Sequence, residues 1–184
     1  MWLAISNQET DPHWQLLTGW RKSYELTLQH MTAVKNYREN LAAAWPPEKS
    51  PAAAAYLQRL DELIANLQQT YDAAVANHGA FSSATMALGS ARTDLDKVVN
   101  EYLANEGKLA AFEKEQAEKP QGGLARQPEA QPPVAAARQE QLLAQARTIM
   151  YGLSSELMQA RAQISKPPLY EPSKRIDNSE VYRE

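Results

Sequence analysis

Cysteine is absent from the sequence of 184 residues, so disulfide bonds, thiolate nucleophiles and cysteine-ligated zinc are excluded. Aromatic residues make up only 8%, with two phenylalanines, and the chain therefore has few of the residues that favour β-strands. The 11 prolines are clustered in a few places, which leaves long stretches free of helix breakers. Alanine, leucine, glutamine and glutamate dominate these stretches. The composition is typical of long α-helices.

A large charge of one sign is also missing. The formal net charge is -3 at pH 7, and no run of basic residues offers a footprint for nucleic acid or an anionic membrane surface. No stretch approaches the roughly 18–20 apolar residues that span a bilayer. Residues 1–11 lack a basic segment, and their apolar run is shorter than the roughly 7–15 residues of a signal-peptide core. We therefore expect a leaderless chain that does not bind nucleic acid or insert into membranes.

The first helix is predicted over residues 12–44. Asp11 can cap its first amide groups, and Pro12 suits the first helical position, where its missing N–H costs nothing. Pro46 and Pro47 follow Trp45 and predict the end of the helix, because neither can donate to it. Apolar residues recur between these limits at spacings of three, four or seven: Trp14, Leu17, Trp20, Tyr24, Leu28, Met31, Val34 and Leu41.

The second helix is predicted from about Ala52 to Glu115, because Ser50-Pro51 repeats the capping signal and no proline follows until Pro120. Its apolar positions alternate in steps of three and four, which is a heptad repeat and predicts coiled-coil packing. Gly79 and Gly89 are the weak points of this helix. The heptad keeps its phase through both, so we predict a continuous helix. The seam is expected to hold a dimer or a bundle together, and it includes Leu57, Leu60, Ile64, Leu67, Tyr71, Leu88 and Leu95.

The heptad repeat ends in the proline- and glycine-rich residues 116–133, which are predicted to form a flexible linker. A third helix is predicted over residues 134–165, and residues 166–184 as a disordered tail. The fold class is therefore all-α: a long antiparallel helical hairpin or coiled coil over residues 1–115, with a third helix and a disordered C-terminal tail. Helices one and three are each about half as long as helix two. We expect the remaining apolar surface to bind a second copy or another helical protein.

The sequence shows no constellation for catalysis. His13, His30 and His78 share no metal-ligand spacing, and His78 falls in the heptad seam, where a packing role is the simpler interpretation. No phosphate-binding loop, dinucleotide fingerprint, nucleophile elbow or His-Glu-x-x-His motif occurs. We therefore expect neither an enzyme nor a bound cofactor or metal.

Two features point to an interaction surface. Trp45 stands at the predicted turn, where a large aromatic either plugs the end of the hairpin or docks onto a partner. Tyr102 and Glu106 lie four residues apart and therefore on one helical face. This spacing is common by chance.

Together these features resemble the Trp-x-Gly (WXG) superfamily of type VII secretion substrates, which includes the PPE-type proteins of actinobacteria. The resemblance covers roughly residues 13–109. It rests on Trp45 at the turn, the following Ser50-Pro51-Ala-Ala-Ala-Ala-Tyr56-Leu-Gln-Arg-Leu-Asp61, and Tyr102-x-x-x-Glu106. Pro47 stands where the family has its glycine.

The resemblance implies a leaderless helical hairpin that dimerises and is exported from the cytoplasm by a membrane ATPase complex. The ATPase complex would recognise the tryptophan turn, Trp45, and the tyrosine–carboxylate pair, Tyr102 and Glu106. The expected partners are a second copy or another helical-hairpin protein, together with the secretion ATPase. The rival hypothesis is a cytoplasmic coiled-coil adaptor or a structural subunit of a larger assembly.

Overall fold

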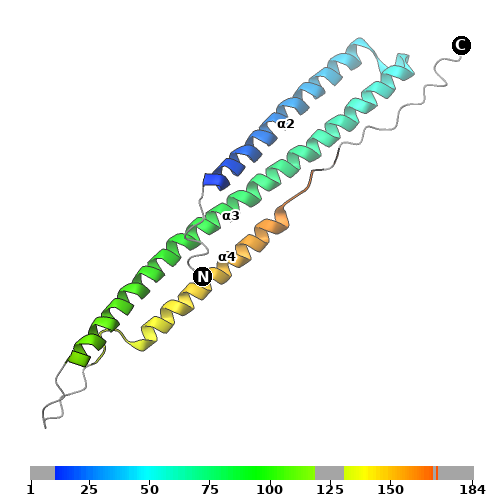
Figure 1. Ribbon diagram of the computed structural model, residues 1–184. Coiled ribbons are helices and arrows are strands. Elements are labelled where there is room, and N and C mark those ends of the chain that lie inside the picture. The colour runs from blue at the N-terminus through cyan, green and yellow to red at the C-terminus, as the bar shows by residue number, and fades with distance from the viewer. Residues whose placement is uncertain (1–10, 119–130, 168, 170–184) are drawn as a thin grey trace, which may run out of the picture. The chain divides into compact units, whose positions relative to one another are not determined.

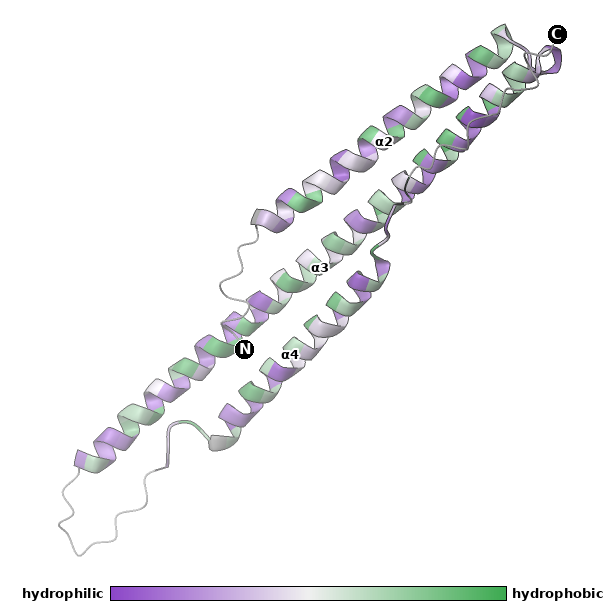
Figure 2. Cartoon of the chain, turned by 45° about the vertical axis from the view of Figure 1, so that its right-hand side comes forward, coloured by the Kyte–Doolittle hydropathy of each residue, from purple (hydrophilic) through white to green (hydrophobic). Residues whose placement is uncertain are grey.

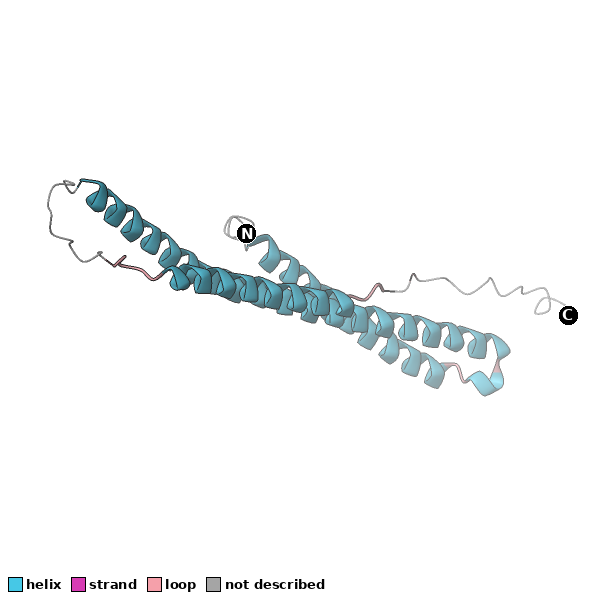
Figure 3. Cartoon of the chain, turned by 90° about the horizontal axis from the view of Figure 1, so that it is seen from below, coloured by secondary structure: helices cyan, strands magenta, loops and turns pink. Residues whose placement is uncertain are grey.

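The computed structural model describes residues 11–118, 131–167 and 169. Most of the predicted linker and tail, and the first ten residues, lie outside this description. The described residues form three α-helices and one short 3-10 helix, joined by loops and with no strand among them (Figure 3). The predicted all-α fold is confirmed.

Helix α2 (Asp11–Ala44) follows the predicted first helix to within one residue. Its last turn is completed by the Trp45 backbone N–H, which donates to the Leu41 carbonyl over 2.7 Å. Pro46 then takes an extended conformation and begins the short 3-10 helix η1 (Pro47–Lys49). The two prolines thus end α2 because neither has an N–H to continue the helix.

Helix α3 (Pro51–Glu118) contains 68 residues in one unbroken run (Figure 1). The Ser50 hydroxyl accepts a bond of 3.4 Å from the Ala53 N–H, and Pro51 fills the first helical position, as the capping signal predicts. Gly79 and Gly89 both stay within the helix, and no glycine among the described residues has a positive φ. The predicted continuous helix is therefore confirmed, and it extends to residue 118, three residues into the predicted linker.

Helix α4 (Ala136–Gln163) lies inside the predicted third helix and is two residues shorter at each end. Its first turn contains a bond of 2.8 Å from the Arg138 N–H to the Ala135 carbonyl. No described helix is both long enough and apolar enough to cross a membrane. Apolar and polar stretches alternate along all three helices, as expected for helices with one buried side (Figure 2).

The described chain divides into two compact units. The first, which we call the hairpin unit, contains residues 12–81 and the described residues from 163 onward. Within it α2 runs antiparallel beside the first part of α3 (Figure 1). Trp20 stacks on Phe81 with ring centroids 6.4 Å apart, and Tyr24 meets the rings of Tyr71 and His78 edge-on at 6.2 and 5.6 Å. These rings are half-buried and make the aromatic part of the α2–α3 contact.

The second, the α3–α4 unit, contains residues 82–118 and 131–162. Here α4 packs beside the later part of α3 (Figure 1). Its core joins Ala91 and Leu95 of α3 to Leu153 of α4. Further side chains pack against this core: Ala87, Leu88, Ala146, Ile149 and Met150. A pair of helices can bury only one stripe on each, so this core is narrow.

Buried residues of α3 also lie beside the predicted seam. In the hairpin unit Ala73, Asn77 and Ala80 are buried, and in the α3–α4 unit Ala91 and Asn105 are. The Asn77 side chain is 2% exposed. Its amide donates to the Ser165 carbonyl over 2.9 Å and accepts from the Ser165 N–H over 2.8 Å. This pair of bonds fastens the segment that follows α4 to α3.

Candidate interaction surfaces

Trp45 occupies the turn between α2 and α3, as predicted. Its indole is 41% exposed, so the side chain is only partly covered by the hairpin. The turn is held by the Ser50 N–H and the Lys49 N–H, which donate to the Pro47 and Pro46 carbonyls. Trp45 is therefore presented by a short ordered turn, with part of its ring open to solvent.

Two tyrosines are also exposed in the hairpin unit. Tyr37 on α2 and Tyr56 on α3 are about half exposed, and a hydrogen bond between their side chains raises the pKa of Tyr37 because it favours the neutral phenol. The next residue of α2, Arg38, donates to both carboxylate oxygens of Asp61 on α3 over 2.5 and 2.9 Å. This bidentate ion pair raises the pKa of Arg38 through hydrogen bonding and charge. The pair fixes α2 against α3 near the turn.

The predicted seam residues divide between the two units. Leu57 and Leu60 are buried in the hairpin unit, where Ile64, Leu67 and Tyr71 are half-buried. Leu88 and Leu95 belong to the core of the α3–α4 unit. All seven residues therefore have reduced exposure within one chain.

Tyr102 and Glu106 lie on one face of α3, as their spacing predicts, and both contact α4. The Gln139 amide donates to a Glu106 carboxylate oxygen over 2.8 Å and to the Tyr102 backbone carbonyl over 3.4 Å. The Gln139 oxygen accepts from the buried Asn105 side chain at 3.5 Å. We call these contacts of Gln139 the clasp. The clasp joins the two predicted signal residues to the first turn of α4.

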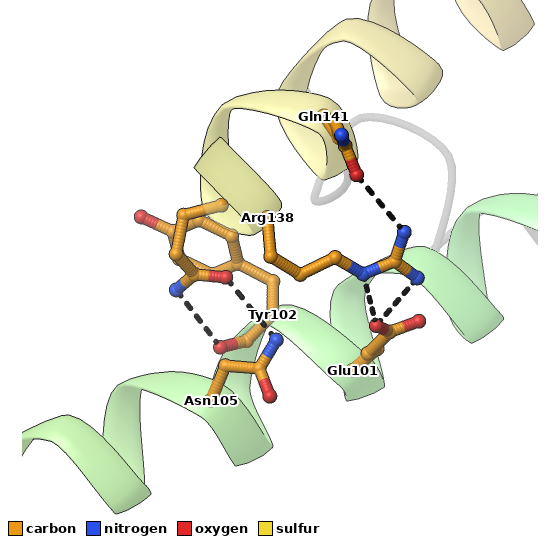
Figure 4. A network of polar contacts seen from close by, with 6 residues as sticks. Glu101, Tyr102, Asn105, Arg138 and Gln141 are labelled. Atoms are coloured by element: carbon orange, nitrogen blue, oxygen red, sulfur yellow. Dashed lines mark hydrogen bonds and ion pairs between the residues drawn. The ribbon is translucent and has the colours of Figure 1, made fainter. Parts of the chain in front are cut away.

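An ion pair stands next to the clasp. The Arg138 guanidinium approaches a Glu101 carboxylate oxygen through two nitrogens, at 2.7 and 2.6 Å, and also donates to Gln141 over 3.4 Å (Figure 4). The Arg138 and Glu101 side chains are 40% and 44% exposed, so water screens their attraction. The pair sets the antiparallel register of α4 and adds little stability.

One face of α4 carries apolar side chains that its own unit leaves uncovered. They are Leu143, Tyr151, Leu157 and Met158, with exposures of 45%, 75%, 40% and 69%, and we call them the α4 face. A groove of about 250 Å³ runs along this face between α3 and α4, and Tyr102 and Leu143 both line it. A second groove of about 290 Å³ includes Leu157 and Met158. Apolar residues gathered in this way are typical of a protein-binding surface.

Trp45 belongs to the hairpin unit, whereas Tyr102 and Glu106 belong to the α3–α4 unit. Neither unit therefore contains all three predicted residues. His13, His30 and His78 are not joined in a metal cluster, since the described residues contain no group of three or more possible ligands. His78 lies against the Tyr24 ring, in the seam where its heptad position placed it.

Sequence reasoning missed the clasp, the Asn77–Ser165 contact and the tyrosine pair. Asn77 and Asn105 could have been suspected, because each interrupts an alanine-rich stripe of α3 at heptad spacing from the other. Gln139 could not have been suspected in this way, since it is one of several polar residues in the first turns of α4 and no spacing sets it apart. Its role depends on how α4 is placed along α3.

These geometries define the class: an all-α protein in which a helical hairpin and a second helix pair present exposed aromatic and apolar side chains. No family model, curated protein or solved structure matches the chain.

Proposed function

We propose that this protein is a non-enzymatic helical-hairpin protein that is exported by a type VII secretion system and acts through helix–helix association. The observation that carries the proposal is Trp45, an ordered tryptophan left 41% exposed at the turn of the hairpin. Tryptophan is the residue most enriched among the dominant contacts of protein interfaces. An exposed indole on a rigid turn is a suitable docking group for the secretion ATPase.

The shallow grooves of the α3–α4 unit support a non-enzymatic role. One of them, of about 530 Å³, is bordered by two carboxylates, Asp94 and Glu156. Asp94 pairs with Lys97 over 3.1 Å on the wet side of α3. A catalytic site normally combines a recessed pocket with convergent polar groups, whereas this groove is lined mainly by small and apolar side chains: Ala87, Ala91, Ile149, Gly152 and Leu153.

The α4 face is the surface that we assign to association, with a second copy of the chain as the partner. Leu143 and Arg147 of α4 both line the groove. A two-fold axis would bring the α4 faces of two copies together, so that their apolar side chains cover each other.

Glutamate substitutions on the α4 face test this association. Leu143→Glu and Leu157→Glu are expected to weaken the dimer at least about thirtyfold, which is about 2 kcal/mol, because each places a charge in an apolar interface. Sedimentation velocity over a range of concentrations measures the effect. Met86→Glu is the matched control, since Met86 is 62% exposed on α3 and lies outside the α4 face.

A wild-type chain that remains monomeric at high concentration would contradict self-association. If it then paired only with a different helical-hairpin protein, that protein would replace the second copy as the partner. Equal dissociation of the Met86→Glu control would mean that the α4 face is not the interface.

Export is tested by removing the docking groups. Trp45→Ala and Glu106→Ala are expected to keep wild-type helicity, because neither side chain is buried. Both variants are expected to accumulate inside a cell that carries the secretion system, because each removes a docking group. The amounts in supernatant and cells are compared with Trp14→Ala and Glu113→Ala, which remove an exposed tryptophan and an exposed glutamate elsewhere on the helices. Normal export of both test variants would refute the proposed signal.

The alternative is a coiled-coil adaptor or structural subunit of a larger assembly. The extent of the α4 face favours it, because such a surface can bind any complementary helix. The two functions differ in the export assay: an adaptor stays in the cell, and neither Trp45→Ala nor Glu106→Ala changes its distribution.

A further inference from the structure

We propose that α4 occupies part of the Tyr102–Glu106 face in the resting protein, so that the first turns of α4 must leave α3 before the export machinery can bind the whole face. The inference rests on the proposed role of Tyr102 and Glu106 in export. It adds regulation to that role: the signal is masked by the chain's own helix.

Hydrogen bonds join the Tyr102–Glu106 face to α4. Glu106 accepts a hydrogen bond of 2.8 Å from Gln139. The same amide reaches the Tyr102 backbone carbonyl over 3.4 Å, a contact that is drawn in Figure 4. Asn105, between them on α3, is 6% exposed and bonds to the oxygen of Gln139. A partner that binds the Glu106 oxygen bonded to Gln139 must therefore compete with Gln139.

Apolar side chains of α4 lie beside the same face. Tyr102 lines the 250 Å³ groove together with Leu142, Leu143 and Ala146 of α4. Tyr102 is half-buried, whereas the next residue, Leu103, is 60% exposed. Tyr102 is thus partly covered beside the same helix that holds Glu106.

The ion pair at this end of α4 is open to water. The Arg138–Glu101 pair is about 40% exposed at each partner, and such pairs contribute little in water. At this end Leu142 of α4 and Val134, just before the helix, are the buried apolar side chains, while the other buried residues of α4, Leu153 and Ala160, lie further along the helix. Helix ends with few buried contacts open more readily than the rest of a structure.

A charge swap tests the mask without altering Tyr102 or Glu106. Arg138→Glu places a second carboxylate beside Glu101 and should loosen the first turns of α4. The double variant Glu101→Arg/Arg138→Glu restores an ion pair with reversed polarity and should close them again. Gln145→Ala, an exposed change on the same helix, is the control.

Two quantities are measured for each variant. Hydrogen exchange of backbone amides 138–147 should become roughly three- to tenfold faster in Arg138→Glu, because the loss of one partly exposed pair and the new repulsion favour opening. The initial rate of appearance in the culture supernatant should rise in the same variant. Both quantities should return to the wild-type values in the double variant.

The outcomes separate the mask from the proposed function. Faster exchange with unchanged or lower export in Arg138→Glu, while Glu106→Ala blocks export, would overturn the mask and leave the signal standing. Unchanged exchange in Arg138→Glu would also overturn it, because a second carboxylate beside Glu101 would then fail to release the first turns of α4 from α3. Wild-type export in both Glu106→Ala and Arg138→Glu would overturn the signal and the mask together.

Discussion

Asparagine 77 illustrates how one buried polar side chain can direct a chain segment. Its side-chain amide donates to the Ser165 carbonyl and accepts from the Ser165 N–H, as a backbone peptide group of a neighbouring strand would. A buried amide without such partners would lose its hydrogen bonds to water and gain nothing in return. Asn77 therefore favours one position of the segment that follows α4.

Replacing Asn77 tests this assignment. Asn77→Ala is expected to lower the free energy of unfolding by about 1–3 kcal/mol, since two hydrogen bonds at a buried side chain are lost and the Ser165 groups lose their partner. Denaturant unfolding gives the free energy, and hydrogen exchange at the Ser165 amide reports the contact itself. Asn100→Ala, an exposed change on the same helix, should stay within about 0.5 kcal/mol of wild type. Equal effects of the two substitutions would contradict the assignment.

At the scale of the element, α3 is the unusual part of the molecule, because 68 residues form one helix that includes Gly79, Gly89 and Gly107. Glycine weakens a helix through the freedom of its unfolded backbone and through lost side-chain contacts. A methyl group added at any of these three positions would meet no other atom within 4 Å. The glycines are therefore not required by close packing within the described chain.

Alanine at Gly79 and Gly89 should stabilise α3. Each substitution is expected to raise the free energy of unfolding by about 0.5–1 kcal/mol, because alanine loses less backbone freedom on folding and fits the open space. Thermal and denaturant unfolding measure the gain, and Ala104→Gly, the reverse change at an exposed position, should cost a similar amount. A loss of stability in Gly79→Ala or Gly89→Ala would indicate a bend of α3 in solution at that glycine.

At the scale of the whole molecule, each unit has the cross-section of a helix pair. A helix pair buries little apolar surface per residue, so its free energy of unfolding is small unless further surface is buried by association. The α4 face offers the surface that a second copy would cover. Association and folding should therefore be linked.

This linkage predicts a melting temperature that rises with chain concentration, because only folded chains associate and association therefore stabilises the folded state. Scanning calorimetry or circular dichroism from micromolar to near-millimolar chain measures the rise. Leu143→Glu should remove the concentration dependence while leaving the melting temperature of the dilute chain nearly unchanged, since Leu143 is exposed in the single chain. A melting temperature independent of concentration in the wild type would contradict self-association.

The sequence was sufficient for the helices and their limits. Pro46, Ser50 and Pro51 act on the backbone within a few residues, and the heptad spacing fixes which side of α3 is apolar. These are local effects, so the limits of α2, α3 and α4 were predicted to within three residues at each end. The position of Trp45 at the turn follows from the same prolines.

Only the tertiary structure decided which side chains meet. The contacts of Gln139 with Glu106, and of Asn77 with Ser165, join residues more than thirty and more than eighty positions apart. They depend on the register of α4 along α3, and a shift of one turn would bring other polar side chains together. Tyr102 and Glu106 share a face because of local spacing, whereas their contacts with α4 come from the packing of one helix against another. Polar contacts between helices leave no period in the sequence, and for that physical reason the clasp became visible only with both helices in place.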